Sequence, residues 1–199
     1  MRKKLMSPQV RDEPQIIACF KAGELERAIA LAAKLGMTLS EGEVRSITDH
    51  LKAGLEEALS IPDPIMTRRL RRRIDCFAAL CNNGFDPKSL IPRVDLPDDY
   101  DGKVLLVAIA GGVIPEVIAL RSNDLYHRDI LRNTQLEIAD LGLPRTQVRE
   151  LGGACISSQS DDRICIWGSS DEFGPGDKEI IAMLVRERYP ERTVVVEDR

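Results

Sequence analysis

Apolar residues recur at helical spacing through the first half of the chain, most clearly in segments 24–36 and 40–59. The second segment opens with Ser40 and Glu43, the S-x-x-E pattern of a capping box. A third helix is expected to start near Pro64, because proline suits the first helical position. The apolar stripes of the last two helices are Val44, Ile47, Leu51, Leu55 and Leu59, and Met66, Leu70, Ile74, Phe77 and Cys81. The pattern predicts a small all-α bundle.

The second half alternates short β-type runs with amphipathic helical segments. Residues 103–110 are apolar almost throughout, which predicts a central strand covered on both faces. Pro115 places the next strand at a sheet edge or a bulge, since proline cannot donate to a ladder. A helix, a strand hairpin around "SDD", a second helix and a last strand follow. The order β-β-α-β-β-α-β predicts an α+β domain with a mixed β-sheet and two packed helices.

Charge divides the chain near residue 89. Residues 1–89 hold 15 Lys and Arg against 12 Asp and Glu, a net of +3, whereas residues 90–199 hold 13 against 20, a net of −7. The junction, 86–102, is rich in proline and aspartate, which break helices. We therefore expect a helical domain at 1–89 and an α+β domain at 90–199.

Composition narrows the class of protein. Hydrophobic residues make up 43% of the chain, yet no apolar run approaches the roughly 20 residues of a membrane span, and no signal-peptide pattern follows the basic start. The five cysteines are odd in number and scattered, which favours a cytoplasmic protein with free thiols. Cys76 and Cys81 lack metal-site spacing, so neither a metal nor a cofactor is expected.

The arginine-rich run at 68–73 raises the possibility of nucleic-acid binding. On a helical wheel Leu70 joins the apolar stripe and the five arginines spread over the other face, which is typical of a solvated helix. Nucleic-acid binding calls for a wider basic surface with stacking aromatics, and this half has neither Trp nor Tyr. We interpret the bundle instead as a partner-docking element or a homodimer contact, with His50 as a boundary side chain.

His127 is the candidate for chemistry, because it falls in the first turn of a predicted helix. Ser122, Asn123 or Asp124 is expected to cap that helix. Free backbone N–H groups and the positive end of the helix dipole form an anion site there, and the same field keeps the imidazole neutral. A neutral imidazole beside an anion suits a general base for phosphoryl hydrolysis. A cap or boundary residue is the alternative reading.

Several segments resemble the Janus family, the family of phosphohistidine phosphatase: "LIPRVDLPDDYDGKVLLV", "YHRDI", "LGGACISSQSDDRICIWGSS" and "FGPGDKEIIAMLVRERYPERTVVVED". The resemblance runs from about Leu90 to the C-terminus. It implies a mixed sheet between helices and removal of phosphate from phosphohistidine without a metal. It implies His127 as the catalytic residue. It also implies phosphate contacts from Lys103, Ser170 and the backbone amide of Arg128.

The chain departs from the family's phosphatase at the expected site. Cys155 and Ala119 replace arginines of the phosphatase, although Arg121 is close to Ala119 in sequence. Asp171 and Glu172 replace small or apolar residues after the matched serine. Like charges 5–6 Å apart at an effective dielectric near 20 cost about 3 kcal/mol, which weakens phosphate binding about a hundredfold.

Two functions therefore stay open. The first is a phosphohistidine phosphatase in which His127 is the base or a transient nucleophile and the substrate is a phosphorylated protein. The second is a binding or regulatory protein that keeps the Janus fold, has changed or lost the chemistry, and docks a protein partner.

Overall fold

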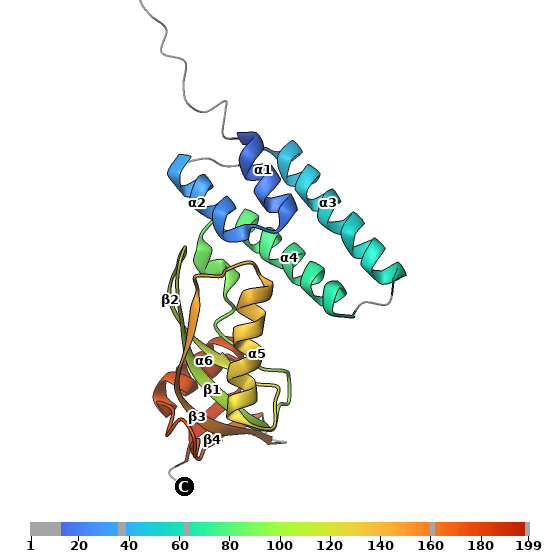
Figure 1. The fold of residues 1–199 in the computed structure, drawn as a ribbon. Coiled ribbons are helices and arrows are strands. Elements are labelled where there is room, and N and C mark those ends of the chain that lie inside the picture. Colours follow the sequence, from blue (N-terminus) through green and yellow to red (C-terminus); the bar gives the residue numbers. More distant parts are fainter. Residues whose placement is uncertain (1–12, 36–38, 62–63, 160–161, 198–199) are drawn as a thin grey trace, which may run out of the picture. The chain divides into compact units, whose positions relative to one another are not determined.

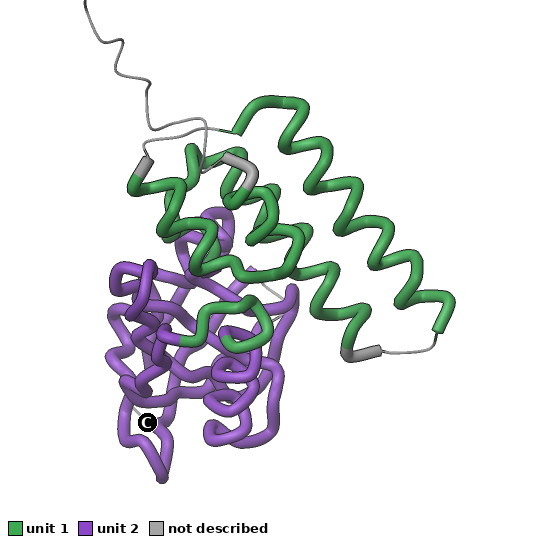
Figure 2. Tube along the Cα trace, turned by 45° about the horizontal axis from the view of Figure 1, so that its top comes forward, with its two compact units in different colours: residues 1–90, 139–144 green, residues 91–138, 145–199 purple. Residues whose placement is uncertain are grey.

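In the computed structural model, residues 13–35, 39–61, 64–159 and 162–197 are described. The chain divides into two compact units, one of residues 1–90 with 139–144 and the other of residues 91–138 with 145–199 (Figure 2). The predicted division at residue 89 into independent domains stays a prediction, because a short segment of the second half groups with the helical unit.

The first unit is helical, as the apolar periodicity predicts. Its helices are α1 (Glu13–Ala22), α2 (Leu25–Leu35), α3 (Glu41–Ser60) and α4 (Pro64–Asn82). The capping box is confirmed, because the Ser40 hydroxyl accepts from the Glu43 amide and the Glu43 carboxylate accepts from the Ser40 amide. Pro64 is the first residue of α4, also as predicted.

The prediction that every residue of the two apolar stripes lies in the core of the helical unit is wrong at two positions. Leu59 is 56% exposed and Met66 is 41% exposed, although both continue an apolar stripe. Leu59 lies in the last turn of α3 and Met66 in the first turn of α4, where these helices extend beyond α1 and α2 (Figure 1). Periodicity predicts which face of a helix is buried, but it does not show where the partner helices end.

The arginine-rich run has internal partners as well as a solvated side. Arg69 donates from Nε and Nη2 to Asp140 Oδ1, each at 2.8 Å. The Arg73 guanidinium lies against the backbone of Gly23, where an added Cβ would stand 2.5 Å from Arg73 Nη1. Leu70 is buried, and His50 is exposed on α3 rather than at the bundle boundary. Arg69 therefore contributes an internal ion pair to the helical unit, whereas Nε of Arg73 is buried without a hydrogen-bond partner among the described residues.

The second unit is built on a five-stranded mixed sheet. Its strands are β1 (Gly102–Gly111), β2 (Ile114–Arg121), β3 (Gln147–Gln159), β4 (Arg163–Trp167) and β5 (Thr193–Val196), in the order β2-β1-β3-β4-β5. Only the β4–β5 pairing is parallel among the described strands. β1 is interior and carries a run of six buried residues, and β2 with Pro115 is an edge, so the predicted fold class is confirmed.

Two helices cover the sheet, α5 (His127–Asp140) and α6 (Lys178–Arg188) (Figure 1). Val104 and Leu106 of β1 pack with α6 in one apolar cluster. Side chains alternate along a strand, so the buried Leu105 and Val107 face the opposite side of the sheet. The buried residues of α5 lie outside the α6 cluster, which places α5 over that opposite face.

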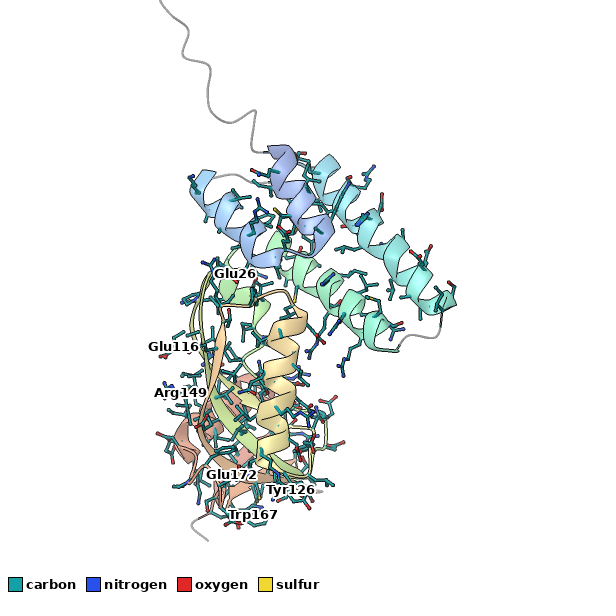
Figure 3. The ribbon with its side chains drawn as sticks, in the orientation of Figure 1. Glu26, Glu116, Tyr126, Arg149, Trp167 and Glu172 are labelled. Atoms are coloured by element: carbon teal, nitrogen blue, oxygen red, sulfur yellow. The ribbon has the colours of Figure 1, made fainter. Side chains whose placement is uncertain are left out.

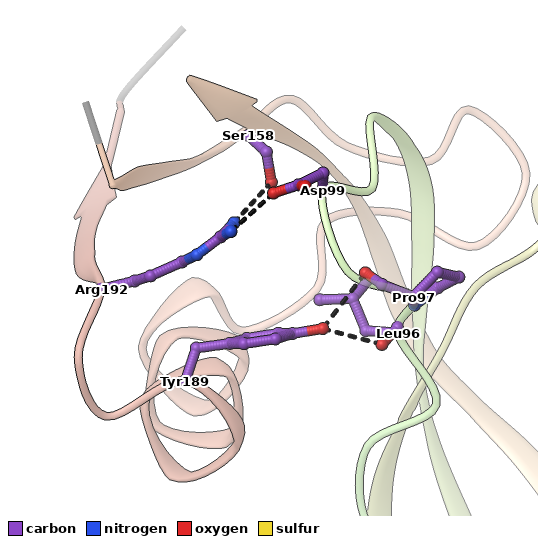
Figure 4. Close-up of polar contacts among 6 residues, drawn as sticks. All are labelled: Leu96, Pro97, Asp99, Ser158, Tyr189 and Arg192. Carbon is purple, nitrogen blue, oxygen red and sulfur yellow. Dashed lines mark hydrogen bonds and ion pairs between the residues drawn. The ribbon is translucent and has the colours of Figure 1, made fainter. Parts of the chain in front are cut away.

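The segment that leads into β1 is fixed by polar contacts to the end of α6 (Figure 4). The Tyr189 hydroxyl donates to the carbonyls of Leu96 at 2.8 Å and Pro97 at 3.1 Å. Arg192 pairs with Asp99 at 2.5 Å and donates to Ser158 at 3.4 Å. The aspartate-rich stretch before β1, which looks like a linker in the sequence, is therefore held in place by hydrogen bonds and an ion pair.

Candidate functional site

His127 is the first residue of α5, and only 5% of it is exposed. Its Nε2 lies 3.1 Å from the carbonyl oxygen of Ala154 on β3. A carbonyl can only accept, so Nε2 carries the proton and Nδ1 keeps its lone pair in the neutral ring. The sheet thus fixes both the orientation and the tautomer of the imidazole. The first-turn position is confirmed, and the imidazole at this position is buried rather than open to solvent.

None of the three expected residues caps α5. The Ser122 hydroxyl donates to the Asp95 carbonyl, Asn123 adopts a φ of 75°, and Asp124 accepts from the neighbouring amide of Leu125. The helix begins three residues after Asp124, beyond the reach of an ordinary N-cap side chain. In the described part of the chain, no hydrogen bond is recorded for the backbone N–H groups of His127 and Arg128. These two amides are suited to hold an anion.

The glycine pair of the "LGG" segment makes room for the histidine. A Cβ on Gly153 would lie 2.5 Å from His127 Nε2 and 2.9 Å from Ser170 Cβ. Gly152 has a φ of 109°, and its Cβ would lie 2.3 Å from the carbonyl oxygen of Pro175. Each glycine is thus required by a different neighbour, and Gly153 brings His127 and Ser170 together.

Ser170 is 4% exposed and sits in a loop that closes on β3. Its backbone N–H donates to the Gly174 carbonyl, and so does that of Gly153, at 3.2 and 3.0 Å. Its hydroxyl oxygen accepts from the Phe173 amide at 3.2 Å, which leaves the hydroxyl proton to donate elsewhere. The sequence places Ser170 near the phosphate site, and the structure places it beside the histidine.

Two cations meet on the ring of Tyr126, the residue before the histidine. Lys103 Nζ and the Arg128 guanidinium carbon each lie 5.3 Å from the ring centroid. Cation–π contacts of this kind attract each cation to the negative face of the ring. Lys103 also stands opposite Cys155 in the β1–β3 register. The positive side of the site is therefore built by β1 and α5 around one aromatic ring, a role of Tyr126 that the sequence did not indicate.

The acidic departures lie at the surface. Asp171 and Glu172 are both exposed, directly after the buried Ser170. Figure 3 labels Glu172 at the same end of the sheet unit as Tyr126 and Trp167. Exposed charges are screened by water and salt, so the repulsion of a phosphate is weaker than the sequence estimate.

Arg121 of β2, the arginine that lies close to Ala119 in sequence, has its side chain directed into the protein. Arg121 is 2% exposed, and its Nη1 donates to the carbonyls of Pro92 at 2.9 Å and Leu120 at 3.0 Å. Ala119, where the family's phosphatase has an arginine, is fully buried opposite Val107. The β2 strand therefore supplies no cation to the surface around Tyr126, where Lys103 and Arg128 lie.

Cys155 is expected to be an inert thiol. Burial raises its pKa, and the neighbouring Lys103 offsets this only in part, because Asp101 raises the pKa further. The thiolate is the nucleophile, so little of the reactive form exists at pH 7.5, and alkylation should accelerate only at higher pH. We predict that iodoacetamide modifies Cys155 no faster than Cys19 or Cys81, as followed by mass spectrometry of the folded protein. Selective labelling of Cys155 at neutral pH contradicts this.

A pocket of about 420 Å³ opens beside Lys103. Its lining is Tyr100, Asp101, Gly102, Lys103, Asn123, Asp124 and Leu125. From the sequence, only Lys103 was expected at this surface. Tyr100, Asp101 and Gly102 fall in the junction rich in proline and aspartate, and Asn123 and Asp124 were expected to cap α5. Among the described residues, no group of acidic, histidine and cysteine side chains is arranged to hold a metal ion. Likewise, none of the described helices is long and apolar enough to cross a membrane.

The fold and the site together define an α+β domain that holds a buried histidine at a helix start, over a glycine pair and beside a lysine and a serine. A search against family models matches residues 89–193 to the Janus/Ocnus family, and the chain belongs to this family. No curated protein sequence matches the chain.

Proposed function

We propose that the protein is a phosphohistidine phosphatase that acts without a metal. The supporting observation is the position of His127, whose ring is fixed by the Ala154 carbonyl so that Nδ1 keeps the lone pair. Lys103, Arg128 and the first amides of α5 supply positive charge and N–H donors for a phosphoryl group beside it. Ser170, buried against Gly153, donates its hydroxyl proton to a phosphoryl oxygen.

The reaction breaks the P–N bond of phosphohistidine. With His127 as the base, Nδ1 takes a proton from water, the water oxygen bonds to phosphorus as the P–N bond breaks, and the protonated His127 then returns this proton to the leaving imidazole nitrogen of the substrate. With His127 as a transient nucleophile, the phosphoryl group moves to Nδ1 and then to water. Both routes need the same neutral ring and the same anion contacts, and neither needs a redox step.

A binding or regulatory module is the second candidate, and one observation favours it. His127 is only 5% exposed and is not among the residues that line the 420 Å³ pocket. A module of this kind would bind a phosphohistidine protein without turnover. Phosphate release from a histidine-phosphorylated peptide, with and without EDTA, separates the two candidates. Release that is insensitive to EDTA supports the phosphatase, and binding without release supports the module.

Lys103→Ala is expected to lower kcat/KM for phosphate release by about one to two decades. A hydrogen bond to a charged group contributes about 1.5–3 kcal/mol, and Lys103 offers one to the phosphoryl oxygens. Arg149→Ala is the matched control, because Arg149 is an exposed cation on β3 that pairs with Glu116 at 3.8 Å (Figure 3). Equal kcat/KM values for Lys103→Ala and the wild type would remove Lys103 from the phosphate site.

A further inference from the structure

The pocket beside Lys103 continues from the candidate site, because Lys103 belongs to both. One wall is the start of β1 with the residues before it, and the other is the loop that leads into α5. At about 420 Å³ the pocket is far larger than a phosphoryl group requires and has the size of a small-ligand or side-chain site. It is therefore placed to receive the part of a substrate that lies next to the phosphohistidine.

The two walls are held together by one hydroxyl group. Tyr100 Oη donates to the Lys103 carbonyl at 2.9 Å and accepts from the Asn123 amide at 3.3 Å. Burial raises the pKa of Tyr100, so the hydroxyl remains a donor at neutral pH. Behind Tyr100, the preceding segment is fixed by Tyr189 and Arg192 (Figure 4). The pocket is thus formed before any substrate binds.

The charge of the lining is acidic on balance. Asp124 accepts from the Leu125 amide at 2.7 Å and from Asn133 Nδ2 at 2.8 Å, contacts that orient its carboxylate without neutralising it. Asp101 is exposed, and its charge reaches the pocket interior, where it helps to raise the pKa of both Tyr100 and Cys155. Lys103 is drawn to the Tyr126 ring on the histidine side. Two carboxylates against the single cation Lys103 leave the lining with a net negative charge, which favours a positively charged guest.

The rim of the pocket is apolar on the side of the histidine. Leu125 is 78% exposed and Tyr126 is 52% exposed, in the two positions directly before His127. An aliphatic stem that ends in a positive charge matches this combination of apolar rim and acidic lining, since lysine and arginine stems cover apolar surface while the charged head reaches a polar partner.

We propose that this pocket binds the residue next to the phosphohistidine of a protein substrate, and that Asp101 and Asp124 select lysine or arginine at that position. The inference rests on the proposed function and specifies its substrate. Asp101 is the specificity-determining residue to test, because it is exposed and makes no recorded hydrogen bond within the described chain, so its replacement leaves the fold intact.

The test uses three phosphohistidine peptides that differ only in the residues on both sides of the phosphohistidine: arginine, alanine or glutamate. For the full-length wild type, kcat/KM should be about two to five times higher with arginine than with alanine, the size expected of exposed ion pairs, and lower again with glutamate. Asp101→Asn should lower the preference for arginine, because only the Asp124 carboxylate then remains, and Asp101→Lys should remove it, because the new cation offsets Asp124. The alanine peptide reports any general effect of either variant on turnover.

Glu116→Gln is the control, because Glu116 is an exposed carboxylate at the end of β2 that is far from the pocket (Figure 3). Its neighbour Val117 pairs with Ile109, whereas the pocket end of β1 is paired through Leu105 with Arg121. It should keep the wild-type preference for the arginine peptide.

Equal turnover of all three peptides by the wild type overturns the inference and leaves the proposed function standing. If no peptide is turned over, the proposed function fails, and binding of stable phosphonate analogues of the same peptides decides the inference. Tighter binding of the arginine analogue that Asp101→Asn weakens supports the inference, and equal binding of the three analogues overturns it.

Discussion

His127→Ala is expected to lower phosphate release from phosphohistidine by two to four decades, the range over which general acid–base groups contribute. The substitution removes the only ring that the Ala154 carbonyl orients, and Lys103 and Arg128 cannot accept a proton in its place. Initial rates of phosphate release under saturating peptide measure the loss in kcat.

The same substitution is also expected to lower the free energy of unfolding by about 1–3 kcal/mol. It leaves the Ala154 carbonyl without its partner and opens space where a buried ring was, and both effects are unfavourable. Urea titration of both proteins measures the difference.

His127→Asn separates catalysis from structure. An asparagine keeps a side-chain N–H that can donate toward the Ala154 carbonyl, but its amide cannot act as a base. It should recover part of the stability and none of the rate. Wild-type turnover in His127→Ala with a large loss of stability would make His127 a purely structural residue.

Local patterns were sufficient for most of the fold. Pro115 predicted an edge strand, and the apolar run at 103–110 predicted an interior strand. The missing proline N–H and the run of apolar side chains each act within a single strand, so neither prediction needs knowledge of distant contacts. Helix α1 was missed, although Ile16, Cys19 and Phe20 form a short buried stripe. Its ten residues hold fewer than three turns, too few for periodicity to stand out.

The site was predicted less completely, because its geometry depends on contacts between distant segments. His127 was singled out by its place at a predicted helix start, and Lys103 and Ser170 by the resemblance, but the burial of the ring depends on Gly153, 26 positions later in the chain. The pocket was missed for the same reason, since the Tyr100–Asn123 hydrogen bond joins a stretch that looks like a linker to one that looks like a cap. Spacing along the sequence carries no information about such pairs.

Gly153→Ala should have the second large effect, because the added methyl group occupies the place of the His127 ring. The new Cβ would lie 2.5 Å from His127 Nε2 and 2.6 Å from Cδ2, so the ring has to move and lose its contact with Ala154. A displacement of about 1 Å at a reacting group costs about a hundredfold in rate, and overpacking costs about 1–3 kcal/mol of stability. We therefore expect about a hundredfold loss of kcat together with a lower urea midpoint.

Gly84→Ala is the matched control for the glycine substitution. Gly84 has a φ of 62° and no atom within 4 Å of an added Cβ, so alanine there introduces backbone strain without a clash. It should lower stability by about 1 kcal/mol and leave turnover unchanged. A comparable loss of kcat in Gly84→Ala would mean that general destabilisation, rather than displacement of the ring, accounts for the effect of Gly153→Ala.

A double-mutant cycle tests whether Gly153 acts through His127. In the His127→Ala background the ring that meets the new methyl group is gone, and only Ser170 Cβ, at 2.9 Å, remains close. Gly153→Ala should then cost less stability than in the wild type, with a coupling of about 1–2 kcal/mol, as expected for residues in direct contact. It should also cost no further turnover, because the group that it displaces is absent. Additive losses in both quantities would show that Gly153 supports the backbone of β3 independently of the histidine.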